Sequence, residues 1–387
     1  MGTKQKGTTK KKRKLNKGRI IILLCELVVL IGVGVLFAFI LKTTGDDGIV
    51  KYDVEDTEAN SEVKEKFEKD ENLQQYRNIA LFGVDPRNGK LLKGTRTDTI
   101  MICSINETTG DVKLVSVYRD TYLNVGNDVY NKCNSAYAKG GPEQAITMLN
   151  MNLDLYISDF VTVGFEGLMD TIDALGGVEI NVTQAEIPHL NNYQASMYCT
   201  EENPNNLTTD YTPVQNPGLQ TLSGYQALAY CRIRAIGNDF QRTERQRTVL
   251  GQILVKAKQE DPAKLTKIAT DVFPKIATSL DVDELISLIS NVNKYNITET
   301  SGFPFDESIT TGNIGSKGSC VVPLDLEYNV ELLHKFLYPD VEYTVSQDVK
   351  AYSQKIYEDT SPYVGGRQPE APQEEQPVPE TAETVAE

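Results

Sequence analysis

Beyond an apolar stretch near the N-terminus, the hydrophobic positions fall into short β-rich runs and longer helical patterns. The strand-like runs lie at residues 79–84, 97–105, 112–118, 157–163, 178–182, 299–303 and 319–322. Apolar residues recur at helical spacing over 130–137, 142–153, 165–175, 222–230, 239–257, 261–278, 282–293 and 326–337. Strands interleaved with helices predict an α/β protein with a central mixed β-sheet flanked by helices, an α-β-α layered domain.

Charged residues flank the first three predicted strands. The turn at 106–111 makes the second and third strands an antiparallel hairpin, so Arg96 and Asp98 are expected near Arg119 and Asp120. Asp85 reaches the same edge if the first strand pairs antiparallel with the second or parallel with the third. Charges often mark strand ends, but five groups of mixed sign at one edge favour a functional site.

A second cationic group lies further along the chain. Arg232 and Arg234 are two residues apart, so an extended segment would place them on one face. Arg242, Arg245 and Gln246 have the i, i+3, i+4 spacing of one helix face. The sequence thus predicts two cationic faces joined by a short polar turn.

The helix that carries the later arginines is expected to begin near Asp239, a plausible N-cap. Arginines in the first turns face the positive end of the helix dipole, which is favourable only when an anion is bound there. The alternative is a solvated helix face whose arginines pair with nearby acids. Both interpretations stay open from the sequence.

The N-terminal part predicts membrane anchorage. Residues 1–19 hold nine Lys or Arg and no acid, and residues 20–41 are apolar apart from Glu26. At about 1.5 Å per residue these 22 residues reach roughly 33 Å, enough to cross a bilayer. The positive-inside rule predicts a single-pass protein of the cell membrane, with a cytoplasmic N-terminus and everything after Lys42 outside. A cleaved signal peptide is disfavoured because no small-x-small site follows Leu41.

The expected organisation has five parts: a basic cytoplasmic tail (1–19), a transmembrane helix (20–41), an acidic, partly helical stalk (42–72), an extracytoplasmic domain (73–345) and a mostly disordered, acidic, Pro-rich tail (346–387). Within the domain, the polar segment 183–219 carries several prolines and is expected to be a functional flap.

Composition narrows the function. The net charge is −15, and without residues 1–19 it is −15 − 9 = −24, which argues against nucleic acid as a partner. The six cysteines are scattered, no spacing matches a zinc site, and His189 and His334 are the two histidines. No P-loop, Gly-x-Ser-x-Gly or His-Glu-x-x-His motif occurs, which disfavours the corresponding hydrolases.

The charged residues suit a diphosphate. Asp85 and Asp98 are candidate ligands of Mg²⁺, or of Mn²⁺ in its place, with phosphate and water completing the shell. The arginines would grip the remaining phosphate oxygens through charge-assisted hydrogen bonds. Such a site fits displacement at phosphorus, where positioning and charge neutralisation do most of the catalysis.

Six ordered motifs in residues 77–258 resemble the LytR-CpsA-Psr family of Gram-positive cell envelope proteins. They are Phe82-Gly83-Val84-Asp85, Arg96-Thr97-Asp98-Thr99, Val117-Tyr118-Arg119-Asp120-Thr121, Asn134-Ser135-Ala136-Tyr137 with Gly140-Gly141, Tyr230-Cys231-Arg232-Ile233-Arg234, and Asp239-Phe240-Gln241-Arg242-Thr243-Glu244-Arg245-Gln246-Arg247.

The resemblance implies a magnesium-dependent phosphotransferase. It would transfer an anionic glycopolymer, of teichoic acid or capsular polysaccharide type, from a polyprenyl-pyrophosphate-linked donor in the membrane lipid to peptidoglycan. It further implies that Asp85 and Asp98 bind the metal, that Arg119, Arg232 and Asp98 are catalytic, and that a wider set grips the pyrophosphate. That set is Arg96, Arg119, Arg232, Arg234, Arg242, Arg245 and Gln246.

Two other functions remain open: a pyrophosphatase that releases the glycan to water, and a non-catalytic regulator that senses envelope lipids. The chain departs from the family at Tyr118, often proline, and at Cys133 and Cys231, for which a bridge is conceivable. Candidate walls for the polyprenyl chain are the helices at 142–153 and 165–175, although an ordinary core shows the same pattern.

Overall fold

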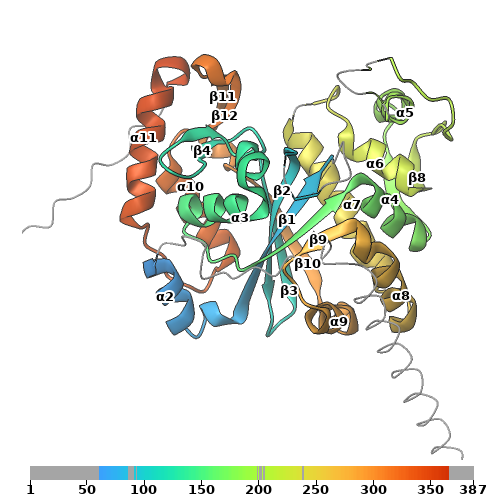
Figure 1. Cartoon of the computed structure of the whole chain (residues 1–387), viewed down its shortest axis with the longest axis horizontal. Coiled ribbons are helices and arrows are strands. Elements are labelled where there is room, and N and C mark those ends of the chain that lie inside the picture. Colours follow the sequence, from blue (N-terminus) through green and yellow to red (C-terminus); the bar gives the residue numbers. More distant parts are fainter. Residues whose placement is uncertain are drawn as a thin grey trace, which may run out of the picture. The chain divides into compact units, whose positions relative to one another are not determined.

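A six-stranded mixed sheet forms the centre of the fold (Figure 1). Its strands are β1 (Tyr76–Val84), β2 (Thr97–Asn106), β3 (Asp111–Val117), β6 (Asp159–Gly164), β9 (Ile276–Thr278) and β10 (Asn296–Phe303), in the spatial order β10-β3-β2-β1-β6-β9. The pairs β1–β6 and β3–β10 are parallel, and the other three pairs are antiparallel. The predicted hairpin of β2 and β3 is confirmed, and β1 pairs antiparallel with β2, one of the two arrangements left open.

The computed structural model describes residues 61–85, 91–92, 94–197, 199, 203, 205–237 and 239–365. All of them belong to one unit by their contacts, Ile49–Glu387. The predicted basic tail and transmembrane helix, and the last 22 residues of the predicted acidic tail, lie outside the described residues. Within the described ranges, no helix combines the length and the apolar character that a membrane span requires.

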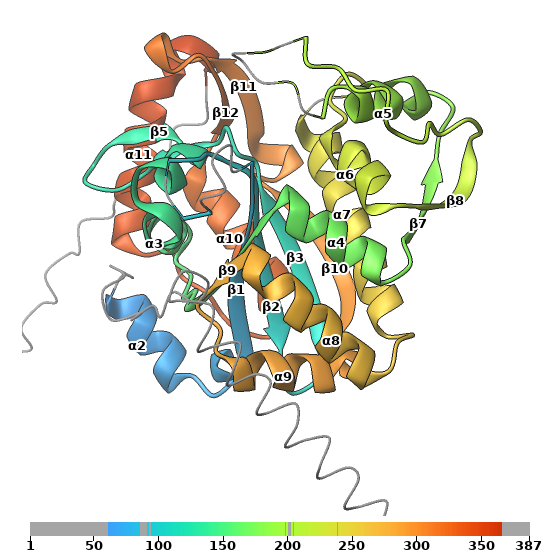
Figure 2. The ribbon, with the colours of Figure 1, turned by 45° about the vertical axis from the view of Figure 1, so that its right-hand side comes forward.

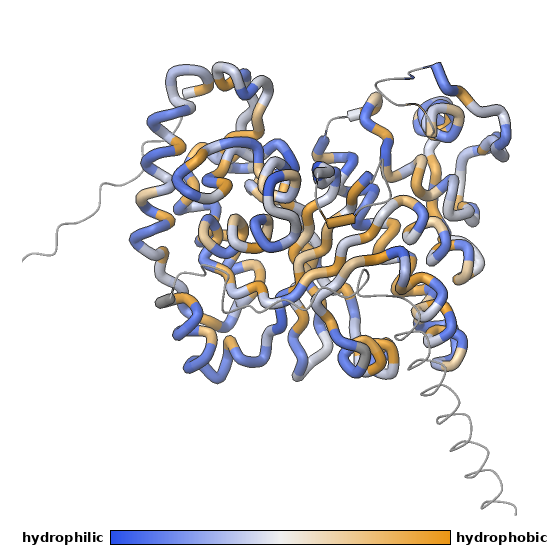
Figure 3. Tube along the Cα trace, viewed as in Figure 1, coloured by the Kyte–Doolittle hydropathy of each residue, from blue (hydrophilic) through white to orange (hydrophobic). Residues whose placement is uncertain are grey.

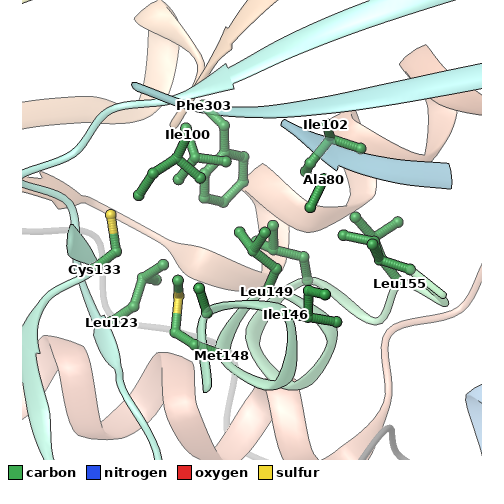
Figure 4. Packing of buried hydrophobic residues seen from close by; sticks show 14 of the residues in the cluster. Ala80, Ile100, Ile102, Leu123, Cys133, Ile146, Met148, Leu149, Leu155 and Phe303 are labelled. Atoms are coloured by element: carbon green, nitrogen blue, oxygen red, sulfur yellow. The ribbon is translucent and has the colours of Figure 1, made fainter. Parts of the chain in front are cut away.

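One face of the sheet carries the main hydrophobic core. It is covered by α2 (Ser61–Lys69), α3 (Asn134–Leu153), α10 (Leu326–Leu337) and α11 (Gln347–Val364). Ala80 of β1 and Ile102 of β2 point from the sheet towards Ile146 and Leu149 of α3 (Figure 4). Hydrophobic positions gather along the central strands, and hydrophilic ones colour the outer helices (Figure 3).

The opposite face is covered by a second set of helices (Figure 2). They are α4 (Phe165–Ala174), α7 (Asp239–Ala257), α8 (Pro262–Val272) and α9 (Val282–Ser290), and α6 (Gly224–Arg232) packs on α4 and α7. Leu250 of α7 and Leu288 of α9 pack on Ile79 and Leu114 of the sheet. The predicted layered α/β architecture is therefore confirmed for the part of the chain that the structure describes.

Three two-stranded ribbons and one further helix surround these layers. The ribbons are β4 (Tyr122–Asn124) with β5 (Tyr130–Lys132), β7 (Val178–Val182) with β8 (Gly218–Leu222), and β11 (Ile309–Asn313) with β12 (Ser319–Pro323); the helix is α5 (Glu186–Ala195). The short 3-10 turns are η2 (Leu73–Gln75), η3 (Phe273–Lys275), η4 (Val292–Lys294), η5 (Asp306–Ser308) and η6 (Gly315–Lys317).

Two sequence-based helix assignments were wrong in part. The helix expected at 130–137 begins only at Asn134, because Tyr130–Lys132 pairs with β4 as a strand. The predicted break before Pro142 is confirmed, since Gly141 has φ 73° inside α3. The helix expected at 261–278 ends at Val272, and Ile276–Thr278 joins the sheet beside β6. In both cases strand pairing overrides the helical pattern, with the neighbouring β4 in the first case and with the distant β6 in the second.

The ends of the domain also differ from the prediction. Val63 and Phe67 of the expected stalk are buried in the main core through α2. The expected disordered tail begins with α11, an 18-residue helix that buries Val349 and Ile356. The folded unit therefore extends past the predicted limits of 73 and 345 on both sides.

Candidate active site

A cavity of about 1310 Å³ lies where β1 and β3 end and β2 begins. Its charged lining residues are Asp85, Arg96, Asp98, Arg119, Asp120, Lys132, Arg232, Arg234 and Arg242. They carry six positive and three negative charges, so the described lining is cationic in a chain whose net charge is −15. A cationic concave surface in an acidic protein favours an anionic ligand.

An irregular register turns Asp98 out of the ladder. Gly83 pairs with Thr99 and Val84 with Thr97, so Asp98 is the extra residue of a bulge between β1 and β2. Such bulges re-aim a side chain beside a functional site. The bulge places the Asp98 carboxylate in the cavity, where it forms an ion pair with Arg119.

Arg119 lies just beyond β3 and is surrounded by carboxylates. It pairs with Asp98, and its Nε lies 3.8 Å from both Asp120 Oδ2 and Asp239 Oδ2. Burial alone would lower the pKa of Arg119, but these three carboxylates outweigh it and the pKa is raised. The predicted proximity of Asp98 to Arg119 is thus confirmed.

Asp239 is the carboxylate that organises the second arginine group. At the first position of α7, it lies 2.8 Å from Arg242 Nη2 and 3.7 Å from Arg234 Nε. Arg234 also lies 3.7 Å from Asp98. The sequence suggested Asp239 only as an N-cap, and its position three residues before Arg242 was the signal for its second role.

Arg242 is the most deeply buried of these cations, with 2% of its side chain exposed. Burial lowers its pKa to about 10, because the charged guanidinium loses hydration that Asp239 only partly replaces. Its Nη2 donates to Asp239 and to the Asp98 carbonyl, while Nε and Nη1 have no hydrogen-bond partner among the described residues. Buried donors without partners call for a ligand or ordered water.

Arg232 ends α6 and faces an aromatic wall. Its guanidinium lies 5.2 Å from the Phe165 ring and 5.8 Å from the Tyr193 ring, and Nη1 contacts Met197 Sδ at 3.1 Å. Tyr193 and Met197 belong to the segment 183–219, predicted as a flap. No pattern in that polar segment pointed to α5 or to these contacts.

The structure separates Arg245 from the other predicted site residues. Arg242 and Gln246 line the cavity, whereas Arg245 is turned about 100° from Gln246 around α7 and is absent from the lining. Its Nε donates to Glu186 Oε1 at 2.8 Å, and Nη1 and Nη2 donate to the carbonyls of Ile233 and Ile236 at 3.2 and 3.4 Å. Arg245 therefore fastens α5 and the loop after Arg232 to α7, and its predicted place among the pyrophosphate ligands is not supported.

The remaining predicted residues lie together. Of the residues predicted from the sequence, the cavity lining contains Asp85, Arg96, Asp98, Arg119, Arg232, Arg234, Arg242 and Gln246. Arg232 is the last residue of α6 rather than part of an extended segment, and Arg234 follows the helix end. Their roles in binding and catalysis remain predictions.

Away from the charged residues the cavity has apolar walls. They are formed by Leu81, Met101, Val161, Val163, Leu168, Leu228, Val249, Leu250 and Ile253, mainly from the sheet, α4 and α7. The apolar residues of 142–153 lie in the main core instead, so that candidate wall was wrong. The other candidate, 165–175, contributes Phe165 and Leu168.

The donor set fits a magnesium ion that is completed by its substrate. Among the described residues, no group of three or more His, Cys, Asp or Glu side chains could hold a metal by itself. Asp85 and Asp98 both line the cavity, and Mg²⁺ typically takes one or two carboxylates and fills its shell with phosphate and water. The two aspartates are therefore suited to a phosphate-bound cation.

The buried thiols of Cys133 and Cys231 are poor nucleophiles. All five described cysteines are free, and no Cys133–Cys231 bridge is present. Burial raises the pKa of the Cys231 thiol to about 12 and that of Cys133 still further. The Cys133 Sγ donates to the carbonyls of Tyr118 and Arg119, both at 3.2 Å, and so supports the turn that carries Arg119.

Comparison with known proteins gives consistent matches. A teichoic acid transferase from Oceanobacillus iheyensis, named polyisoprenyl-teichoic acid–peptidoglycan teichoic acid transferase TagU, is 31% identical over 223 residues. The match covers 55% of this chain and 62% of that relative, just under two thirds of its length.

Solved structures share the fold. Bacillus subtilis TagV superposes with a TM-score of 0.52 at 25% identity, covering 68% of this chain and 97% of TagV. A structure described as TagT bound to LI-WTA superposes with a TM-score of 0.53 at 21% identity, covering 70% and 93%. The model of the LytR_cpsA_psr family matches residues 46–318, well over half of the sequence. The chain therefore belongs to the LytR_cpsA_psr family.

Proposed function

We propose that this protein transfers an anionic glycopolymer, of teichoic acid or capsular polysaccharide type, from a polyprenyl-pyrophosphate-linked donor to peptidoglycan. The product would be a phosphodiester between the polymer and a peptidoglycan sugar. The names of relatives such as the Oceanobacillus TagU support the transferase class and both substrates.

One observation carries the proposal: a single cavity joins a cationic end to apolar walls. The cationic end, with the unpartnered donors of Arg242, suits a diphosphate. The walls offered by α4, α7 and the sheet suit a hydrocarbon chain. A lipid diphosphate combines these two chemistries in one molecule.

Arginines of the cavity lining have distinct roles in the proposed transfer. Arg119 and Arg232 would neutralise the charge on the reacting phosphate, while Arg234 and Arg242 hold the neighbouring oxygens. The acceptor hydroxyl oxygen bonds to the glycan-proximal phosphorus, the bond from that phosphorus to the bridging oxygen breaks, and polyprenyl phosphate leaves. The ion pairs with Asp98 and Asp239 keep the arginines oriented before the donor arrives.

Asp85 and Asp98 are the residues that would hold Mg²⁺, or Mn²⁺, in this proposal. The cation would supply charge neutralisation at the diphosphate. Removal of divalent cations with a chelator is expected to abolish transfer, and added Mg²⁺ to restore it.

The proposal includes a location at the cell membrane with the cavity outside the cytoplasm. It is supported by the nine cations of residues 1–19 and the apolar residues 20–41. A C-terminal epitope should be digested by protease added to intact protoplasts. Full protection of that epitope would contradict the proposed orientation.

The test of function uses the full chain in detergent with a radiolabelled lipid-linked donor and insoluble peptidoglycan. Label that sediments covalently with peptidoglycan supports transfer. Arg119→Ala and Arg232→Ala should lower the rate by roughly 10²- to 10³-fold, the range for loss of one charge-stabilising group. The control is Lys267→Ala, which removes an exposed cation of α8 that does not line the cavity.

The other outcomes decide between the alternatives. Label released as free phosphoglycan, in the presence of peptidoglycan, would indicate a pyrophosphatase. Donor binding without turnover would indicate a regulator that senses the lipid. Undiminished transfer by a folded Arg232→Ala variant would contradict the assigned site.

A further inference from the structure

Asp120 lines the cavity but is neither a candidate metal ligand nor a phosphate-binding residue in the proposed transfer. Of the three carboxylates in the described lining, Asp85 and Asp98 are the candidate metal ligands. A metal-bound carboxylate is a poor base because the cation withdraws its charge. Asp239 is committed to Arg242 at 2.8 Å and does not line the cavity. Asp120 is therefore the carboxylate of the described lining that can accept a proton from the acceptor hydroxyl.

Asp120 reaches the cavity from the side opposite to the apolar walls. Asp120 lies between β3 and β4. Lys132, at the end of β5, and Asn134, at the start of α3, also line the cavity. These elements pack on the face that carries α3, whereas α4 and α7 cover the other face (Figures 1 and 2). The cavity therefore has one polar wall, which lies opposite its apolar walls.

The direction of attack links this wall to the acceptor. In phosphoryl transfer the attacking and leaving oxygens are roughly in line on opposite sides of the phosphorus. The leaving group here is polyprenyl phosphate, whose chain suits the walls of α4 and α7. A hydroxyl that enters in line must then approach from the side of Asp120 and Lys132.

We propose that Asp120 is the general base for the acceptor hydroxyl, an inference that rests on the proposed transfer. An oxygen of its carboxylate takes the hydroxyl proton as the new oxygen–phosphorus bond forms. The bond to the bridging oxygen breaks, polyprenyl phosphate leaves with the electron pair, and Asp120 later passes the proton to water. Lys132 orients the carboxylate.

The surroundings of Asp120 suit this task. Its Oδ2 lies 3.8 Å from Arg119 Nε and its Oδ1 lies 3.6 Å from Lys132 Nζ. Both cations hold it beside the arginine that would grip the reacting phosphate, and a quarter of its side chain is exposed to an incoming acceptor. The other titratable groups that face it are the thiols of Cys133 and Cys320.

The decisive comparison is Asp120→Asn against the unaltered full chain, in the transfer assay and in a donor-binding assay. Asparagine keeps the shape but cannot take the proton, so kcat should fall roughly 10²- to 10⁴-fold while donor affinity stays within about twofold. The control is Asp111→Asn, at the far end of β3 and exposed. Asp120→Ala should regain part of its activity when formate is supplied as an external base.

The possible results separate this inference from the proposed function. If the unaltered chain neither binds the donor nor transfers polymer, the proposed function fails and this inference with it. If the unaltered chain transfers and Asp120→Asn transfers equally well, only the role of Asp120 is overturned. Should neither variant fold, Lys132→Ala must lower kcat, because Lys132 orients the Asp120 carboxylate, and an unchanged kcat would overturn the inference.

Discussion

At the scale of single residues, the arginine cluster is held together by a carboxylate that contributes nothing to the cavity surface. Asp239 contacts Arg242, Arg234 and Arg119 within 3.8 Å. Like-charged guanidinium groups repel one another, and they can be gathered before an anion binds only if carboxylates lie among them. The cluster is therefore a site prepared in advance for its ligand.

Asp239→Asn is expected to destabilise the protein by roughly 3 kcal/mol, because it leaves the buried Arg242 without its carboxylate. An anionic ligand should replace part of the missing charge. Inorganic pyrophosphate should therefore raise the melting temperature of the variant more than that of the unaltered protein. Thermal unfolding with and without pyrophosphate measures both effects.

The control for this comparison is Asp283→Asn, an exposed acid near the start of α9. It should change the free energy of unfolding by less than about 0.5 kcal/mol. An Asp239→Asn variant as stable as this control would show that Asp239 does not hold the cluster.

At the scale of elements, one ion pair joins three segments around the cavity. Glu186 at the start of α5 and Arg245 of α7 are 9% and 11% exposed, and Arg245 also binds the loop between α6 and α7. Burial alone would raise the pKa of Glu186, but hydrogen bonds from Thr183 and Arg245 outweigh it and the pKa is lowered. The pair therefore makes part of the stability depend on pH.

For a carboxyl with a lowered pKa, the added stability is present above about pH 4.5 and is lost as pH falls through the lowered value. Glu186→Gln should remove this acid-side loss and should cost roughly 3 kcal/mol at neutral pH, because Arg245 keeps its charge without a partner. Denaturant unfolding from pH 3 to pH 7 measures both. A pH profile unchanged by Glu186→Gln would contradict this assignment.

The last helix, α11, is an integral part of the core. Val349 and Ile356 are buried, and Ser353 Oγ accepts a hydrogen bond from the Leu326 amide at 3.2 Å. Full burial of each apolar side chain is worth about 1.5–3 kcal/mol, so the helix supplies a large share of an ordinary domain's stability.

A chain ending at residue 345 should therefore lose cooperative unfolding or precipitate. A chain ending at residue 365 keeps α11 and should unfold like the full chain. Circular dichroism on heating compares the two truncations. Equal cooperativity of both would show that α11 is dispensable.

At the scale of the whole molecule, a buried histidine links acid sensitivity to the main core. The His334 ring stacks on Tyr343 with centroids 3.6 Å apart, and Nε2 is 2.9 Å from the Leu153 carbonyl. Burial lowers the pKa of His334 to about 3, because its charged form would lose hydration. The native protein therefore keeps this ring neutral.

The unfolded chain takes up that proton near pH 6.5, and the native state does not until about pH 3. Stability should fall as pH drops through this window, by at most about 1.4 kcal/mol per pH unit. His334→Gln should flatten the decline between pH 6.5 and 4.5, where Glu186 does not yet contribute. His189→Gln, at the second histidine of the chain, serves as control and should leave the decline intact.

Much of the fold followed from local pattern. The runs at 79–84, 97–105 and 112–118 became β1, β2 and β3, because alternation and turn chemistry are properties of the chain itself. The hairpin geometry also placed Asp98 beside Arg119, since a tight turn fixes the register of its strands.

The sequence by itself therefore determined the α/β layers, the first three strands and most of the charged residues that line the cavity. These features depend on spacing within one element or one hairpin. Only the tertiary structure decided the side of α7 on which Arg245 lies, the strand at Ile276–Thr278 and the burial of α11. Those features depend on partners in other elements of the chain, such as Glu186 for Arg245 and β6 for the strand at Ile276–Thr278, and no local period encodes such a contact. The apolar walls of the cavity were decided in the same way, because an isolated stripe of leucine and valine has the same pattern whether it faces a core or a ligand.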